Sequence, residues 1–116
     1  MTMRILLLLA VVAACNKGKS EPAATKASCH TSASQSCEEY ESTGKAYLDS
    51  RSKDCKQIAG VWSTTACPTA GLLGSCRETT PNWTRTRHYY AGASIELEKT
   101  KAECGAFGKW IEPAKP

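Results

Sequence analysis

Residues 75–90, "SCRETTPNWTRTRHYY", decide the fold expected for this chain. Two runs that contain threonine, the second also rich in aromatic residues, flank Pro81-Asn82, a pair that favours a turn. The stretch therefore predicts a β-hairpin. Because side chains alternate along a strand, the second strand would carry four residues on one face: Trp83, Arg85, Arg87 and Tyr89.

This set of four residues is the candidate anion-binding surface. A guanidinium group binds a carboxylate or a phosphate through two points, so two arginines between two aromatic rings would suit an acidic glycan or a phosphate. The alternative is that Trp83 and Tyr89 pack on a helix while the arginines are solvated. The sequence leaves both interpretations open.

Two segments predict helices. Residues 36–59 offer Ser36 as an N-cap, acidic residues in the first turns and a broken apolar stripe at helical spacing. Residues 95–107 follow Ser94 and end before Gly108. Residues 61–66 and 109–113 predict short strands, and residues 67–74 predict a loop. Together they predict a small disulfide-stapled α+β domain with two helices and a short antiparallel sheet of three to four strands.

Two similar segments follow the expected helices. Residues 55–62, "CKQIAGVW", and 104–110, "CGAFGKW", each place a cysteine before Gly, one residue and Trp. Each segment predicts the end of a helix, a glycine stop and a strand whose Trp packs back. Their spacings differ by one residue, so the sequence alone does not define a repeat.

The N-terminus predicts export. Arg4 precedes an apolar run over residues 5–12, which is too short for the ~20 residues that span a bilayer. The segment Val12-Ala13-Ala14-Cys15 resembles the bacterial lipobox. The resemblance implies cleavage before Cys15 and attachment of lipid to its sulfur, which would hold the chain on a membrane. Asn16, where an Asp would resemble an inner-membrane retention signal, favours the outer membrane, with the domain on the periplasmic or cell-surface side.

These features divide the chain into three parts. Residues 1–14 are the expected lipoprotein signal peptide. Residues 15–28 contain the lipidated Cys15 and a segment without large apolar side chains, which predicts a flexible tether. Residues 29–116 are the expected cysteine-rich globular domain.

Seven cysteines are present, and Cys15 is reserved for lipid. In an exported small domain, the even remainder predicts three disulfides among Cys29, Cys37, Cys55, Cys67, Cys76 and Cys104. The pairing expected is Cys29–Cys37, Cys55–Cys67 and Cys76–Cys104. A single helix over residues 36–59 would place Cys37 and Cys55 on one face, which leaves other pairings open. Structural zinc sites use cysteines two to four residues apart, and the closest pairs here are eight and nine apart, so no metal or other cofactor is expected.

Part of the chain is similar to a group of proteins. From Cys55 to Trp110 the order is Cys, Gly-x-Trp, Cys-Pro, Gly-Ser-Cys, Tyr-Tyr, Cys, Gly-x-Trp. This order resembles a group of short, cysteine-rich exported bacterial proteins without an established activity. The resemblance implies a disulfide framework and carries no functional residue.

The net charge and the spacing of potential catalytic residues limit the classes of function that we expect. Removing Arg4 with the leader leaves 14 basic and 11 acidic residues, a balance of +3 without the clustering typical of nucleic-acid-binding proteins. His30 and His88 are the only histidines, and no Ser-His-Asp or two-His arrangement follows from their spacing, so no enzyme is expected. Two functions stay open. One is a membrane-held structural or interaction protein of the cell envelope that contacts another protein. The other is a tethered binding module for an anionic glycan or lipid head group.

Overall fold

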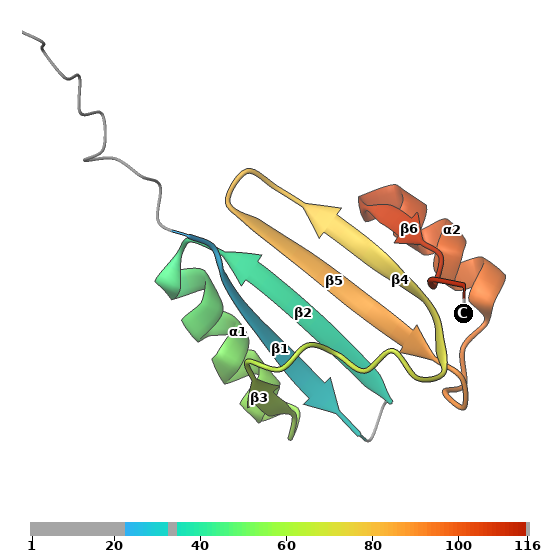
Figure 1. The fold of residues 1–116 in the computed structure, drawn as a ribbon, viewed down its shortest axis with the longest axis horizontal. Coiled ribbons are helices and arrows are strands. Elements are labelled where there is room, and N and C mark those ends of the chain that lie inside the picture. The colour runs from blue at the N-terminus through green and yellow to red at the C-terminus, as the bar shows by residue number, and fades with distance from the viewer. Residues whose placement is uncertain (1–22, 33–34, 116) are drawn as a thin grey trace, which may run out of the picture.

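An antiparallel β-sheet runs through the centre of the molecule (Figure 1). The structure is a computed structural model and describes residues 23–32 and 35–115. Over those residues the sheet has six strands in the order β3-β1-β2-β5-β4-β6, accompanied by two helices. The expected α+β class is confirmed, with more strands than the three to four expected. The leader, Cys15 and the tether as far as residue 22 lie outside the described residues.

The elements form two units with the same topology. The first unit contains β1 (Thr25–Thr31), β2 (Ser36–Ser42), α1 (Lys45–Gln57) and β3 (Val61–Ser63). The second contains β4 (Leu72–Thr79), β5 (Trp83–Tyr90), α2 (Leu97–Phe107) and β6 (Lys109–Ile111). In each unit a hairpin precedes a helix, and a three-residue edge strand returns to pair with the first strand of the hairpin. Strands β2 and β5 join the two units in the middle of the sheet.

Side chains also repeat between the units. In each unit a disulfide fixes the helix to the first strand, and the Trp of the edge strand stacks on a Tyr of the second strand. Trp62 lies 5.6 Å from Tyr40, and Trp110 lies 5.7 Å from Tyr89, between ring centroids. The expectation that each Gly-x-Trp segment ends a helix and packs its Trp back is therefore confirmed. The equivalent residues are Cys29 and Cys76, Glu38 and Arg87, Tyr40 and Tyr89, Cys55 and Cys104, Gly60 and Gly108, Trp62 and Trp110.

The hairpin predicted over residues 75–90 is confirmed as β4 and β5. The Thr80 N–H donates to the Trp83 carbonyl at 2.8 Å, and Thr80 Oγ1 accepts the N–H groups of Asn82 and Trp83. These bonds close the turn around Pro81. Strand β5 lies beside β2, so the predicted surface residues reach the centre of the sheet.

The single helix expected over residues 36–59 is wrong in its first part. Residues 36–42 form β2, and the helix begins only at Lys45, after Gly44. Cys37 and Tyr40 are both buried, but on opposite faces of the sheet. A strand covered on both faces does not alternate cleanly between apolar and polar residues, so its pattern also matched helical spacing.

The flexible tether expected as far as residue 28 ends earlier. Strand β1 begins at Thr25 and pairs with the full length of β2. Ala27 is 8% and Ser28 1% exposed, and Ser28 Oγ donates to the Thr65 carbonyl at 2.6 Å. Small side chains therefore pack here against covering elements, although their composition resembles that of a tether.

Disulfides explain how both faces of the sheet are covered. The described part of the chain contains three: Cys29–Cys55, Cys37–Cys67 and Cys76–Cys104. The last pairing was predicted, and the other two predicted pairings are wrong. Cys29 lies opposite Glu38 in the ladder, so Cys29 and Cys37 point to opposite faces. Each disulfide closes 26 to 30 residues and stabilises the fold by about 2–4 kcal/mol.

We name the two faces of the sheet by what covers them. The helix face carries α1 over the first unit and α2 over the second, each fixed by its disulfide. The loop face is crossed by residues 64–71, the connection between β3 and β4 (Figure 1), which the Cys37–Cys67 disulfide fixes. A small core lies under α1, where Tyr47, Leu48 and Trp62 pack against Cys29, Tyr40 and Cys55.

Several element ends differ from expectation. Helix α2 begins at Leu97 with no side-chain cap, so Ser94 is not its N-cap. It ends before Gly108 as predicted, and a Cβ on Gly108 would lie 2.4 Å from the Arg77 carbonyl oxygen. The edge strands end at Ser63 and Ile111, short of the expected residues 66 and 113. Among the described residues, no helix has the length and apolar character needed to span a bilayer.

Candidate functional site

The predicted surface residues lie on the helix face, between α1 and α2. Two shallow cavities open there, one of about 170 Å³ toward α1 and one of about 150 Å³ toward α2. Both are lined by Arg85 and Arg87. We call this surface the central groove, defined by Glu38, Glu78, Arg85, Arg87 and Tyr89.

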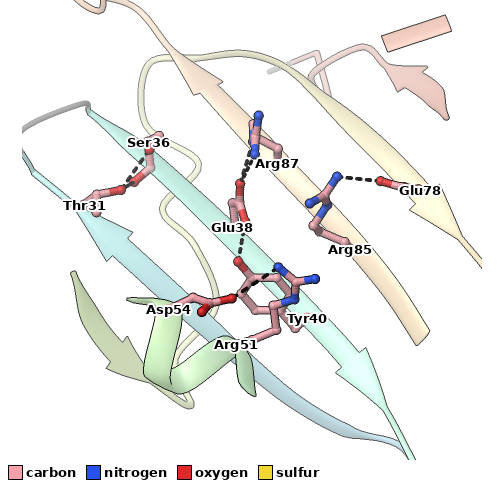
Figure 2. Close-up of polar contacts among 9 residues, drawn as sticks. All are labelled: Thr31, Ser36, Glu38, Tyr40, Arg51, Asp54, Glu78, Arg85 and Arg87. Carbon is pink, nitrogen blue, oxygen red and sulfur yellow. Dashed lines mark hydrogen bonds and ion pairs between the residues drawn. The ribbon is translucent and has the colours of Figure 1, made fainter. Parts of the chain in front are cut away.

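Arg87 belongs to a chain of three polar groups at the junction of the two units (Figure 2). Its Nε and Nη2 both lie 2.5 Å from Glu38 Oε1. The other oxygen of Glu38 accepts a hydrogen bond from the Tyr40 hydroxyl. Glu38 and Arg87 face each other directly in the ladder between β2 and β5. The equivalent positions of the two units thus carry opposite charges and pair.

The same contacts fix the charge of this cluster. Burial alone would raise the pKa of Glu38, but the hydrogen bond from Tyr40 and the charge of Arg87 outweigh it and lower the pKa. Burial likewise opposes the charge of Arg87, yet Glu38 raises the pKa of Arg87 above its ordinary value. Burial and the neighbouring carboxylate both raise the pKa of Tyr40. Glu38 is therefore ionised and Tyr40 neutral at physiological pH.

Arg85 is also paired. Its Nη2 lies 2.6 Å from Glu78 Oε2, which projects from the neighbouring strand β4. On the α1 wall, Arg51 lies 3.7 Å from Asp54 (Figure 2). Each of these arginines is compensated by a carboxylate, so the floor of the central groove presents paired charges.

The aromatic members of the predicted set pack against other elements. Trp83 stacks on Tyr47 of α1 with centroids 5.2 Å apart and rings 6° from parallel. Tyr89 stacks on Trp110 of β6. The four residues share one face, as predicted, and for Trp83 the alternative of packing on a helix is correct. The arginines are ion-paired, which neither interpretation expected.

The walls of the central groove carry exposed apolar side chains. Ile58, just after α1, is 64% exposed, and Phe107, the last residue of α2, is 76% exposed. Each lines one of the two cavities. Aromatic residues and arginine are enriched where proteins bind proteins, and the groove combines both with paired charges and apolar walls.

A second polar set on the loop face was missed from the sequence. Ser75 Oγ lies 2.7 Å from His88 Nδ1, and His88 Nε2 lies 3.2 Å from Glu39 Oε1. Glu39 Oε1 also accepts the N–H of Cys67 at 2.8 Å. Serine, imidazole and carboxylate in a row resemble a nucleophile with its base, but Ser75 is only 4% exposed. The set fixes residues 64–71 to the sheet.

Part of this set, the contact between Ser75 and His88, can be predicted from the sequence. Once the turn is placed at residues 80–83, the hairpin register puts Ser75 directly opposite His88. The contact of Glu39 with His88 could not be predicted in this way, because Glu39 lies in β2, which was predicted as part of a helix.

Comparison with known proteins adds no relative: no protein-family model, curated protein or solved structure matches the chain. The interpretation of the site therefore depends on its geometry.

Proposed function

We propose that the chain is a membrane-anchored bacterial lipoprotein whose sheet domain binds another protein of the cell envelope through the central groove. The observation that carries the proposed binding is the combination of paired arginines on the floor with exposed Ile58 and Phe107 on the walls. Exposed apolar side chains beside paired polar groups are typical of contact surfaces between proteins.

The anchor has its own support. Of the seven cysteines in the sequence, the disulfides take six, and the remaining one is Cys15 of the lipobox-like segment. A thiol outside the disulfide framework is available for lipid. In a Cys15→Ser variant we expect the protein to leave the membrane fraction while the domain still folds.

The ion pairs of the groove favour a protein segment over an anionic ligand. An anionic glycan or lipid head group would have to compete with Glu38 and Glu78 for the same guanidinium groups. A protein segment need not displace them, because a guanidinium carries five N–H donors and can donate its remaining N–H groups to carbonyl oxygens of the segment. We therefore propose a protein segment with an apolar side chain for each wall as the occupant, ahead of an anion.

Site-specific photocrosslinking tests the groove. A crosslinking amino acid is placed at Ile58 or Phe107 in the membrane-anchored chain within its own envelope. Matched controls carry it at Arg77 or Lys109, which are exposed on the loop face. We expect one discrete protein adduct from the groove positions and none from the controls. Equal adducts from both faces, or none from the groove, would contradict the proposal.

A further inference from the structure

Both histidines of the sequence lie beside the same disulfide. His30 of β1, Cys37 of β2 and His88 of β5 occupy directly opposed positions in three adjacent strands, so their side chains share the loop face. Residues 64–71 bring Cys67 over this row, where it bonds to Cys37. Two sulfurs and two imidazole rings thus converge from four segments of the chain.

The potential ligand atoms are close together. A ring nitrogen of His30 and the sulfurs of Cys37 and Cys67 lie within 4.8 Å of one another. A ring nitrogen of His88 and an oxygen of Glu39 lie within the same distance of each other and of Cys67. Cys67 is shared, so the two groups form one continuous cluster.

Neighbouring hydroxyls hold both rings. His30 Nε2 lies 2.8 Å from Ser28 Oγ, and His88 Nδ1 lies 2.7 Å from Ser75 Oγ. His88 Nε2 is buried, makes no hydrogen bond and lies 3.2 Å from Glu39 Oε1. Metal-binding histidines are commonly oriented in this way, by a hydrogen bond from the ring nitrogen that does not bind the metal.

We propose that the cluster becomes a zinc site when the Cys37–Cys67 disulfide is reduced. A dithiol reductant transfers two electrons and two protons to the disulfide, and the dithiol itself becomes a disulfide. The two thiols then lose their protons as they bind the metal. Two thiolates and two imidazoles are a donor set that zinc binds tetrahedrally. The ligands are Cys37, Cys67, His30 and His88, with Ser28 and Ser75 positioning the rings.

No spacing rule finds this set, because only His30 and Cys37 come from strands that are consecutive in the sequence, while Cys67 and His88 come from segments far along the sequence. The intact disulfide has no thiolate to offer. Zinc binding is therefore conditional on the redox state of one disulfide, and it replaces the covalent link between residues 64–71 and the sheet by a coordinate one.

The test uses the mature chain treated with a phosphine reductant, which leaves zinc free to bind. Zinc per chain is measured by elemental analysis, and Co²⁺ replaces it to report tetrahedral thiolate coordination by absorption. We expect one metal per reduced chain, none per oxidised chain, and at least a 10-fold loss of affinity in a His30→Gln, His88→Gln variant. Cys29→Ser, Cys55→Ser is the matched control, which keeps all four ligands.

Reduction also opens the other disulfides, so a variant must separate a folded site from an unfolded chain that captures metal. Ser75→Ala removes only the hydroxyl that contacts His88 Nδ1. We expect this variant to bind zinc about 10-fold more weakly, whereas an unfolded chain would show no change. The proposal is overturned if the reduced chain binds no metal, if the oxidised chain binds equally, or if affinity is independent of His30 and His88 or of Ser75.

Discussion

The two units of the molecule share one topology but differ in how their helices pack. Helix α1 covers a core in which Tyr40, Cys29 and Cys55 are each less than 9% exposed. Each helix buries one residue of its own, Cys55 in α1 and Cys104 in α2. Under α2, however, the strand residues Cys76 and Tyr89 are only half-buried, and Phe107 is exposed to solvent. The second unit therefore depends less on a buried core and more on its helix-to-strand disulfide and its strand pairing.

The largest expected difference concerns the two equivalent disulfides. Both close loops of similar length, 26 and 28 residues, so their entropic contributions are alike. Cys29 and Cys55 lie inside the aromatic core, whereas Cys76 is half-buried. We expect Cys29→Ser, Cys55→Ser to lower the free energy of unfolding by about 4 kcal/mol and Cys76→Ser, Cys104→Ser by about 2–3 kcal/mol. Urea denaturation measures both, and equal or reversed costs would contradict the packing difference.

The second-largest effect on stability is expected at the junction between the two units, where Glu38 pairs with Arg87. Glu38→Gln removes the charge that Arg87 faces and weakens the acceptor of Tyr40. Because the Glu38 side chain is only 18% exposed, we expect a cost of about 1–3 kcal/mol. The control is Asp49→Asn, which breaks the exposed pair with Lys45 and should cost at most about 0.5 kcal/mol. Equal costs in urea denaturation would refute a structural role for the junction pair.

Acid should destabilise the protein in two steps, one from each unit. Burial lowers the pKa of His88 in the second unit, and the contacts of Glu38 lower its pKa in the first. A lowered pKa means that the unfolded chain takes up the proton first, so stability is lost as pH falls. We expect the His88 step to begin below about pH 6.5 and the Glu38 step below about pH 4.5.

Variants assign the two steps. Unfolding free energies from urea titrations over a pH series should lose the upper step in His88→Gln and the lower step in Glu38→Gln. If the free energy of unfolding rises as pH falls through either range, the direction assigned to the pKa shift of that residue is wrong.

The smallest effect on stability is expected at the groove walls. Ile58→Asp and Phe107→Asp change side chains that are mostly in solvent, so each should alter the free energy of unfolding by no more than about 0.5 kcal/mol. Each substitution should nevertheless abolish the crosslinked adduct that forms when the crosslinking amino acid stands at the other of these two positions. A large loss of stability would instead mean that these residues support the fold.

Part of this comparison was accessible from the sequence. The β4–β5 hairpin follows from its turn chemistry, and the two Gly-x-Trp segments follow from their helix-stop pattern. The repeat itself was not recognised, because the sequence did not predict the first hairpin, which β1 and β2 form. Residues 36–42 carry buried side chains on both faces and matched a helix, and residues 25–28 lack large apolar side chains and matched a tether.

The candidate site shows a similar division. Local alternation correctly places Trp83, Arg85, Arg87 and Tyr89 on one face. The carboxylates that neutralise the arginines come from β2 and from the other strand of the hairpin, and their pairing depends on strand order and register. The same is true of the disulfides, since only the sheet determines which cysteines face which helix.

The lipid anchor and the disulfide framework are tested most directly by the intact mass of the protein extracted from membranes, measured with and without alkylation under non-reducing conditions. We expect a chain that begins at Cys15, carries acyl groups on it, has six cysteines in disulfides and takes up no alkylating agent. An unlipidated Cys15 would contradict the anchored lipoprotein. Alkylation at any of the other six cysteines would contradict the disulfide framework that holds both helices and residues 64–71 on the sheet.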